Sequence, residues 1–386
     1  MRNIVIVGGG PAGMMAAISA KKHHPDTEVY LLERNHTLGK KLALSGGGRC
    51  NLSVRVSDEQ FIKDTIRNGK FLYSAIHQFT LDDIEQFFLD AGLPFKEEDH
   101  HRLFPITEKA EDVIALLRNT LKDLGVMIIY QQKVERIDLQ HKKVITNQDV
   151  FPFEHLILAC GGKSYPDTGS DGLGYELATQ VDHSITDILP AEVSLVSNDA
   201  CIQSKELQGL SFHDVKIKIK KNNKYKDLVR HDLIFTHFGI SGPGALRASS
   251  HINKLLQKGP ITLAIDFLPD VSSEQLAKQI KEDGLFSLAK TYGLPKRFLQ
   301  YVDTMTGDKA LHIKRFALSV YTTRGLQQAF VSDGGVRIKD IDPKTMQSKI
   351  HPCISFAGEM MDVHGYTGGY NISIAFISGY IAGYYA

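Results

Sequence analysis

A glycine-rich turn between a buried strand and a helix constrains the fold of this chain more than any other feature. Residues 4–7 are apolar without alternation, which indicates a strand buried on both faces of a parallel sheet. A helix is expected over 11–23 and a second strand over 29–32, where Glu33 ends the strand. The turn between the first strand and the helix has the GxGxxG spacing and contains Gly8, Gly10, Pro11, Ala12 and Gly13. Together these elements predict a βαβ unit and an α/β fold.

Each glycine of this turn has a physical role in binding a dinucleotide. The first permits the tight turn, the second lets a pyrophosphate approach the backbone, and the third lets helix and strand pack closely. The helix N-terminus offers free N–H groups and a positive dipole to the phosphates. Glu33 stands at the right distance to accept hydrogen bonds from a ribose diol, and only Arg34 is placed to take a 2′-phosphate. The pattern therefore predicts a dinucleotide with an unphosphorylated ribose rather than a bare glycine turn.

A second glycine cluster, near the end of the chain, favours FAD over NAD. Residues 358–362 (Gly-Glu-Met-Met-Asp) follow an expected strand, and Gly368-Gly369 open an expected final helix. An acidic side chain there suits the ribityl hydroxyls of FAD, and a helix N-terminus stabilises the pyrimidine edge of reduced flavin. The glycines at 169–174 follow no apolar strand, so we predict no second nucleotide site. NAD(P)H is expected only as a transient electron donor.

These motifs together resemble the BaiN/RdsA family of FAD-dependent oxidoreductases, which includes aminoacetone-oxidase-like flavoproteins. The most specific are Ser-Gly-Gly-Gly-Arg-Cys-Asn at 45–51 and the Gly-Glu…Asp…Gly-Gly-Tyr-Asn pattern at 358–371. The resemblance spans essentially the whole chain. It departs at Ser332-Asp333, where relatives tend to have Thr-Ala, and at 101–105 (His-Arg-Leu-Phe-Pro), where they often have Gly-Arg-Val-Phe-Pro. Substrate contacts near these two segments are therefore not carried over.

The chain is expected to form one nucleotide-binding domain from its two ends, interrupted by an inserted module. The FAD-binding parts are predicted at 1–190 and 331–386, and the substrate-side insert at 191–330. Within the insert, 191–268 is rich in strands and 269–315 is helical. The resemblance implies a discontinuous Rossmann domain of the glutathione-reductase type and a β-barrel-like strand part.

The resemblance also implies which residues line the FAD groove. The glycine turn would hold the pyrophosphate, Glu33 the adenosine ribose and Val134 the adenine. Glu359 and Asp362 would face ribityl or phosphate groups, and Tyr370 would sit at the isoalloxazine. The expected FAD-binding residues are Gly8, Gly10, Pro11, Ala12, Gly13, Glu33, Arg34, Lys41, Gly46, Gly47, Arg49, Asn51, Val134, Ala159, Gly161, Gly162, Gly358, Glu359, Asp362, Gly368, Gly369, Tyr370 and Asn371.

The catalytic residues are not identified by the sequence, which offers candidates only. Cys50 follows an arginine, so a thiol of lowered pKa is one interpretation, and the favoured one is a small buried residue of the flavin pocket. His237 lies before a Gly-Pro turn and suits catalysis and backbone hydrogen bonding equally. His364 and Tyr366 flank the flavin-edge motif and are candidates for substrate contact, as is Tyr370. No metal site is predicted.

The charge balance argues against a dedicated nucleic-acid binder. Forty-five Lys and Arg oppose 44 Asp and Glu, a formal net charge of +1. One expected hairpin, with Asn222-Asn223 at its turn, is nevertheless basic. An RNA-binding ribbon is one interpretation, and the favoured one is an exposed edge kept soluble by lysines. Its basic residues are Lys216, Lys218, Lys220, Lys221, Lys224, Lys226 and Arg230.

The cysteines and the apolar segments indicate the compartment. Four cysteines lie far apart without a CxxC pair, which excludes a zinc ribbon and a redox-active dithiol and suits a reducing cytoplasm. The uncharged run at 371–386 is shorter than the roughly 20 residues that a membrane span needs. We therefore expect a cytoplasmic protein with no membrane association, while its oligomeric state stays open.

Two enzymatic functions and one non-enzymatic function remain compatible with the sequence. The first is an oxidase that takes hydride from a small primary amine such as an α-aminoketone and passes electrons to dioxygen, giving peroxide. The alternative is an NAD(P)H-dependent reductase of an activated C=C bond, in an enone or in uridine of ribosomal RNA. The third, ranked last, is an FAD-binding structural protein. A single dinucleotide site places the oxidase slightly ahead of the reductase.

Overall fold

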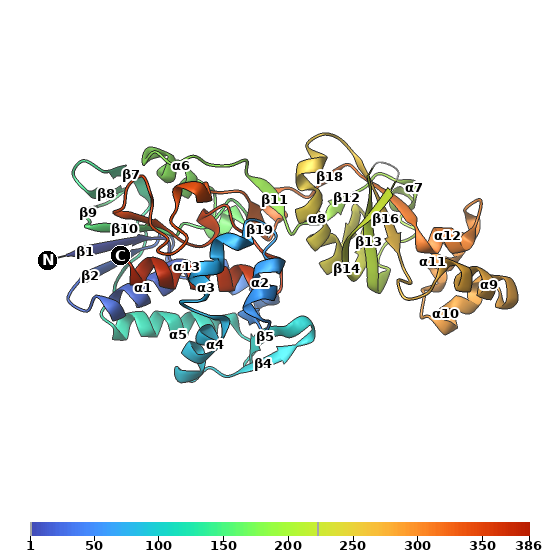
Figure 1. Ribbon diagram of the computed structural model, residues 1–386, viewed down its shortest axis with the longest axis horizontal. Helices are drawn as coiled ribbons and strands as arrows, with labels where there is room; N and C mark the ends of the chain where they lie inside the picture. Colours follow the sequence, from blue (N-terminus) through green and yellow to red (C-terminus); the bar gives the residue numbers. More distant parts are fainter. Residues whose placement is uncertain (1, 222–223) are drawn as a thin grey trace. The chain divides into compact units, whose positions relative to one another are not determined.

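The computed structural model describes residues 2–221 and 224–386 and divides into two compact units. Unit 1 comprises Met1–Ile188 and Val331–Ala386, and unit 2 comprises Leu189–Phe330 (Figure 1). The chain thus leaves unit 1 once, forms unit 2, and returns. The expected turn at Asn222-Asn223 lies outside the described residues.

A five-stranded parallel sheet forms the centre of unit 1. Its strand order is β20-β10-β1-β2-β6, and every neighbouring pair is parallel. Ile4–Val7 of the middle strand are buried, as their unbroken apolar character predicts. The strand β20 comes from the C-terminal segment, so the last part of the chain completes a sheet begun by the first residues. The strands are β1 (Asn3–Val7), β2 (Glu28–Leu32), β6 (Met127–Ile129), β10 (His155–Leu158) and β20 (Ile354–Phe356).

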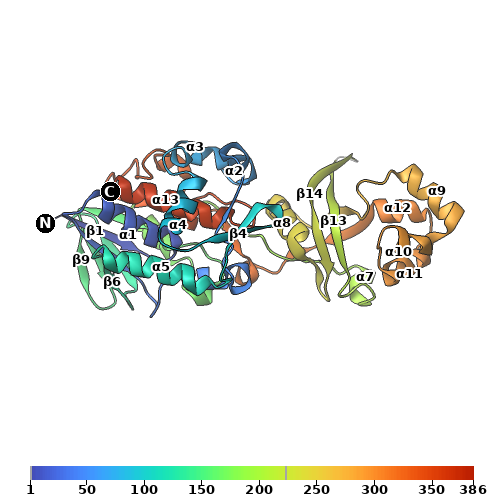
Figure 2. The ribbon, with the colours of Figure 1, turned by 90° about the horizontal axis from the view of Figure 1, so that it is seen from below.

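The first and last helices of the chain pack against each other. Helices α1 (Pro11–His23) and α13 (Tyr370–Tyr384) lie side by side in both views (Figures 1 and 2). A Cβ atom added at Gly379 would lie 2.2 Å from the Ala12 carbonyl oxygen. One added at Gly383 would lie equally close to the Ala16 carbonyl oxygen. Glycine at these two positions therefore lets the two backbones approach, which explains why both helices are rich in small residues.

Smaller antiparallel sheets and helices surround this centre in unit 1. One three-stranded sheet has the order β3-β5-β4 and another the order β7-β8-β9. These strands are β3 (Ser53–Val54), β4 (Phe95–Glu98), β5 (Arg102–Pro105), β7 (Val134–Asp138), β8 (Lys143–Thr146) and β9 (Val150–Pro152), and β19 (Val331–Asp333) also belongs to unit 1. The remaining helices are α2 (Asp58–Asp64), α3 (Tyr73–Ile76), α4 (Leu81–Asp90), α5 (Ala110–Asp123) and α6 (Leu173–Gln180).

Unit 2 combines a seven-stranded sheet with helices. The strand order is β17-β16-β13-β14-β15-β12-β18, and all of its neighbouring strands pair antiparallel. The strands of unit 2 are β11 (Leu189–Ala191), β12 (Leu195–Val196), β13 (Ser211–Lys221), β14 (Lys224–Phe235), β15 (Gly239–Ser241), β16 (Ile261–Asp266), β17 (Phe316–Val320) and β18 (Thr322–Thr323). Its helices are α7 (Ala200–Gln203), α8 (Gly242–Leu256), α9 (Ser273–Asp283), α10 (Leu288–Thr291), α11 (Lys296–Thr304) and α12 (Lys309–Lys314). A buried cluster of phenylalanines forms its core: Phe212, Phe235, Phe267, Phe298 and Phe316.

The basic hairpin of unit 2 is not simply a sheet edge, so that interpretation is wrong for its first strand. β13 pairs with β14 on one side and with β16 on the other, and its Ile217 and Ile219 are buried. Several of its cations also have carboxylate partners. Lys218 pairs with the buried Asp266 at 3.3 Å, and Lys216 with Asp227 at 3.2 Å.

None of the helices formed by the described residues has the length and apolar character that a bilayer crossing demands.

Candidate FAD site

Of the three glycines in the GxGxxG motif after β1, two occupy crowded positions and one an open position. A Cβ atom at Gly8 would lie 2.4 Å from the Ala159 carbonyl oxygen, and one at Gly13 would lie 1.8 Å from the Gly8 carbonyl oxygen. A Cβ atom at Gly10 would meet no atom within 4 Å. The first and third glycines are therefore required by packing within the protein, whereas the second borders open space. This is the arrangement that a pyrophosphate lying against the turn requires.

The N-terminus of α1 faces that open space without a cap of its own. Gly10 is the N-cap residue, no side chain caps the helix, and its first turn carries no acidic residue. Pro11 occupies the first helical position, where a missing N–H costs nothing. The N–H groups of the first turn need partners, and phosphate oxygens supply such partners at helix N-termini.

Glu33 holds the turn in shape from the end of β2. Its Oε2 accepts a hydrogen bond from the Gly9 N–H at 2.8 Å, and its Oε1 accepts from the backbone and side-chain nitrogens of Asn35. A carboxylate has about four acceptor sites, so three bonds leave capacity for a ribose hydroxyl. The neighbouring Arg34 turns away from Glu33 and pairs with Asp171 at 2.6 Å. The buried Val134 begins β7, two residues after Gln132, whose N–H donates to the Glu33 carbonyl oxygen.

The loop between β2 and β3 contains Asn51, a buried residue with a side-chain oxygen that is unpaired within the described part of the chain. Asn51 is buried, and its Oδ1 has no hydrogen-bond partner among the described residues. Gly47, at φ +69°, borders open space, while a Cβ at Gly46 would lie 2.9 Å from the Asn51 nitrogen. Arg49 is already engaged: its guanidinium pairs with Glu98 at 2.9 Å and lies 4.2 Å from the centre of the Phe104 ring. Asn51 therefore fits a bound polar group, and the contacts of Arg49 hold the loop.

Segments from both ends of the chain meet at Glu359. Its Oε2 accepts from Lys41 Nζ at 2.7 Å, and its Oε1 accepts from the Ser332 N–H and from Ser164 Oγ. Burial opposes ionisation of this carboxyl, but Lys41 and the Ser332 N–H outweigh it and hold its pKa below the ordinary value. Glu359 is therefore an ionised acceptor that a hydroxyl-rich chain can reach.

Glycines keep the backbone around Glu359 compact. A Cβ atom at Gly162 would lie 2.5 Å from Glu359 Oε1, and one at Gly358 would lie 2.8 Å from the Cβ of Ala12. Gly161, at φ +76°, carries the chain out of β10 just after Ala159, whose N–H donates to the Val7 carbonyl oxygen. The expected residues at 159–162 and at 358–359 therefore lie together, next to the start of α1.

Asp362 makes an ion pair that the sequence does not suggest. Its two carboxylate oxygens accept from Nε and Nη2 of Arg67, both at 2.8 Å, and the carboxylate side chain is only 4% exposed. The Asn68 side chain donates to the Asp362 carbonyl oxygen. Arg67 and Asp362 are 295 residues apart, and no motif marks Arg67, so only the tertiary structure identifies it. A contact of Asp362 with a ribityl or phosphate group, as the resemblance implies, would therefore use a carboxylate that already binds Arg67.

At the expected flavin edge, side chains hold the start of α13 in place. Tyr370 Oη donates to Asp64 at 2.6 Å, and its ring stacks on Phe61. The Asn371 side chain bonds to the backbone of Gly365 and Tyr366. The helix α13 starts after Gly368 and Gly369, at φ +109° and +102°, and no side chain caps it. Its N-terminal N–H groups therefore resemble those of α1 in lacking a side-chain cap.

Cys50 does not have the cationic setting that would activate a thiol. Its side chain is fully buried, burial raises its pKa to about 12, and the neighbouring Arg49 is turned to Glu98. Of the two interpretations of Cys50, the small buried residue agrees with the structure and the activated thiol does not, because burial disfavours the thiolate.

The pKa of Cys50 predicts that this thiol is inert in the native protein. At pH 8 a pKa near 12 leaves a thiolate fraction on the order of 10⁻⁴, so iodoacetamide should leave Cys50 unlabelled. Cys353, which is half-buried, serves as the comparison in the same sample. Peptide mass spectrometry measures both, and equal labelling of the two cysteines in folded protein would contradict the prediction.

The candidate histidines lie in different units. His237 is in unit 2, in the turn between β14 and β15, with its ring 5.0 Å from that of Phe238. His364 is in unit 1 and is 1% exposed, and its Nδ1 lies 3.6 Å from Asp333 Oδ1. Tyr366, two residues further on, is half-buried in the same loop. Within unit 1 the structure thus joins His364 and Tyr366 to the expected flavin edge.

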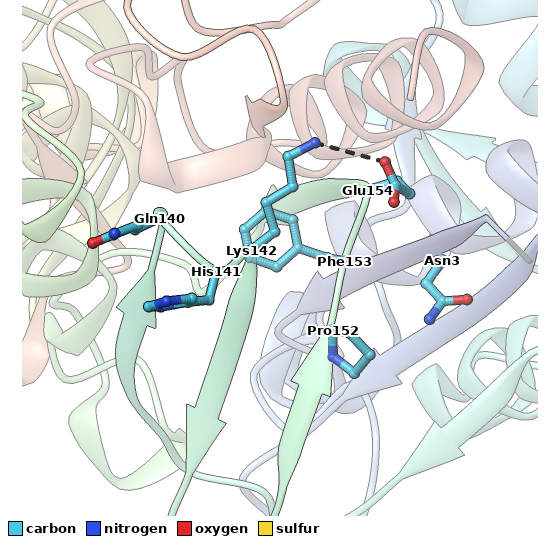
Figure 3. A pocket seen from close by; sticks show the side chains of 7 residues that line it. All are labelled: Asn3, Gln140, His141, Lys142, Pro152, Phe153 and Glu154. Carbon is cyan, nitrogen blue, oxygen red and sulfur yellow. Dashed lines mark ion pairs between the residues drawn. The ribbon is translucent and has the colours of Figure 1, made fainter.

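A surface hollow in unit 1 does not belong to this site. Asn3, Gln140, His141, Lys142, Pro152, Phe153 and Glu154 line it, and Lys142 pairs with Glu154 across it (Figure 3). Asn3 begins β1, whereas the glycine turn follows the other end of that strand. Ligands of open parallel sheets bind at the carboxyl ends of the strands, so the hollow is at the wrong end.

Comparison with known proteins gives full-length matches. Residues 2–385 match the family described as HI0933-like protein Rossmann domain. A 3-dehydro-bile acid delta(4,6)-reductase of Clostridium scindens is 29% identical, over 99% of this chain and 98% of that protein. A ribosomal RNA dihydrouridine synthase of Escherichia coli is also 29% identical, over 97% of this chain and 95% of that protein. The structure of the open conformation of a flavocytochrome c3 fumarate reductase shares the fold, with a TM-score of 0.56 at 18% identity, covering 100% of this chain and 78% of that one.

Proposed function

This chain belongs to the HI0933-like protein family and is an FAD-dependent oxidoreductase, and we propose that it reduces a carbon–carbon double bond conjugated to a carbonyl group. The Rossmann-type fold and the family expected from the sequence are confirmed. The proposal rests on one observation above all: two relatives that match nearly the whole chain are named for reductions of such bonds.

The residues of unit 1 fit FAD. The open space at Gly10 and the uncapped N-terminus of α1 suit the pyrophosphate, and Glu33 has acceptor capacity for the adenosine ribose. The orphaned Oδ1 of Asn51 and the ionised Glu359 suit hydroxyl and N–H groups further along the cofactor.

When bound, FAD supplies hydride transfer, and the protein supplies binding, orientation and electrostatics. The N-terminus of α13 would stabilise negative charge on the pyrimidine edge of bound FAD. Tyr370 and Asn371 fix that helix end through Asp64 and through the Gly365 backbone. Lys41 keeps Glu359 ionised, so that its oxygens accept rather than donate hydrogen bonds.

The relatives reverse the order of the two enzymatic hypotheses from the sequence. A bile acid delta(4,6)-reductase and a dihydrouridine synthase share one chemistry, because an enone and a uracil ring each hold a C=C bond next to a carbonyl. Neither name refers to an amine oxidase, so aminoacetone oxidation ranks second here. Electrons for the reduction would come from a nicotinamide hydride donor.

We favour a small-molecule substrate over RNA. Arg230 of the basic hairpin pairs with Asp214 and Asp270, as Lys216 and Lys218 pair with carboxylates. These internal pairs reduce the positive charge that the hairpin offers to a phosphate backbone, on which nucleic-acid affinity depends.

Anaerobic mixing tests the proposed function. NADPH or NADH should bleach the flavin, and an enone such as a 3-oxo-Δ4 steroid should then restore the yellow colour without oxygen. Aminoacetone should leave the oxidised flavin unchanged, which provides the control in the same apparatus. Bleaching by aminoacetone, with no reoxidation by any enone or uridine-containing RNA, would establish the oxidase instead.

A further inference from the structure

His364 is a buried side chain whose hydrogen-bonding capacity is unused. The residue is 1% exposed, and neither Nδ1 nor Nε2 has a hydrogen-bond partner among the described residues. Buried polar atoms in folded proteins are nearly always paired, so an unpaired ring usually faces a ligand or a water molecule. Other buried histidines here follow the rule: His183 bonds through both nitrogens, to the Val181 carbonyl oxygen and to Ser348 Oγ.

His364 also lies in a buried cluster of charges. Asp333 Oδ1 is 3.6 Å from His364 Nδ1 and 3.6 Å from Arg67 Nε, and Arg67 in turn binds Asp362 through two hydrogen bonds. Asp333 and Asp362 are each 4% exposed at the side chain. Two carboxyl groups therefore lie near one guanidinium, and both favour the cationic form of His364.

The backbone ties this cluster to the proposed flavin edge. The Arg67 N–H donates to the His364 carbonyl oxygen, and the Asp362 N–H donates to the Val336 carbonyl oxygen. Asp333 is followed by Gly334 and by Gly335, whose added Cβ would lie 2.6 Å from the Met360 carbonyl oxygen. The loop with His364 leads directly into the uncapped N-terminus of α13.

We propose that Asp333 and His364 form a buried acid–base pair that supplies the proton consumed when the double bond is reduced. This role rests on the proposed function. Reduction adds a hydride to the carbon β to the carbonyl and a proton to the α-carbon. The hydride would come from a nicotinamide donor by way of bound FAD, His364 would give the proton, and water would then return a proton to its ring. Asp333, whose Oδ1 lies 3.6 Å from Nδ1, stabilises the cationic form of the ring.

The electrostatics suit a proton donor. Burial lowers the pKa of His364 below its ordinary value and is the largest effect, Asp333 and Asp362 oppose it, Arg67 adds to it, and Glu359 opposes it weakly. Burial therefore makes the imidazolium release its proton readily. The carboxylates oppose this effect and favour the protonated form. The rate of acceptor reduction should accordingly fall as the pH rises through this pKa.

Separate half-reactions test the role. With flavin pre-reduced by dithionite, His364→Gln should slow reoxidation by a 3-oxo-Δ4 steroid by at least about 100-fold, whereas reduction by dithionite should be unchanged. Asp333→Asn should slow this reoxidation less than His364→Gln does. It should also shift to lower pH the point at which the reoxidation rate falls. His183→Gln, which removes a buried histidine with satisfied nitrogens, should stay within about twofold of the wild type.

A titration of the flavin-free protein provides a readout independent of turnover. The imidazole ¹⁵N signals that disappear in His364→Gln are assigned to His364. The pKa of His364 measured from these signals should be lower in Asp333→Asn than in the wild type. An unchanged pKa in Asp333→Asn, or a wild-type reoxidation rate in folded His364→Gln, would overturn the pair. Failure of the wild-type protein to reduce any unsaturated acceptor would overturn the proposed function and this role with it.

Discussion

A Gly10→Val variant should fold like the wild type and lose FAD. Gly10 has φ −79° and ψ −177°, an extended conformation that valine adopts readily, and its added Cβ meets no protein atom within 4 Å. The valine methyl groups would instead occupy the space proposed for the pyrophosphate. We expect FAD affinity to fall at least about 100-fold, roughly 2.7 kcal/mol, with little change in the melting temperature of flavin-free protein. Flavin fluorescence titration measures the first and calorimetry the second.

Gly13→Ala provides the contrasting variant three residues away. Its Cβ would lie 1.8 Å from the Gly8 carbonyl oxygen, so the helix must move off the strand. The free energy of unfolding should fall by about 3 kcal/mol or more, with or without FAD. Wild-type affinity in Gly10→Val would show that the pyrophosphate does not lie against this turn.

An Arg67→Met variant should be strongly destabilised at neutral pH. The substitution leaves the Asp362 carboxylate buried without the cation that gives it two hydrogen bonds, and Asp333 adds a second negative charge nearby. Removing one partner of a buried pair costs about 3 kcal/mol or more. Urea unfolding at pH 7 measures this loss.

Two further variants separate the ion pair from the loss of the arginine side chain. Arg67→Met combined with Asp362→Asn should recover much of the stability, because the buried charge is gone. Arg230→Met breaks two ion pairs of unit 2 whose members are largely exposed, and it should change stability little. Equal losses in Arg67→Met and in the double variant would show that packing, and not charge, dominates at this site.

Much of unit 1 follows from local pattern. The unbroken apolar run at 4–7 predicts a central strand, the glycine spacing predicts the helix at 11–23, and both are observed. The Rossmann-type fold and the family were also predictable, because glycine motifs reflect backbone geometry that few other residues tolerate. By contrast, the lysine-rich β13 suggested an edge strand, and only the pairing with β16 showed otherwise. Lysines at every second position indicate that one face of the strand is exposed. They do not indicate whether other strands pair with its two edges.

The site shows the same division at the level of side chains. Gly10 and Glu33 were recognisable because their positions follow from one continuous βαβ unit. For Cys50 the sequence left two interpretations open, because adjacency to Arg49 does not fix where the guanidinium points, and in the structure it points to Glu98. Arg67 was missed because nothing near it in the sequence marks a buried ion pair.

The sequence by itself therefore determined the backbone features that arise within about thirty residues: strand, tight turn, helix and second strand. Only the tertiary structure decided which distant side chains share a site, such as Lys41 with Glu359 and Asp333 with His364. The physical reason is the distance along the chain over which each interaction acts. Steric limits on φ and ψ and the periodicity of apolar residues act between neighbours along the chain. Ion pairing and burial act through space, and their partners are set by how the whole sheet and its helices pack.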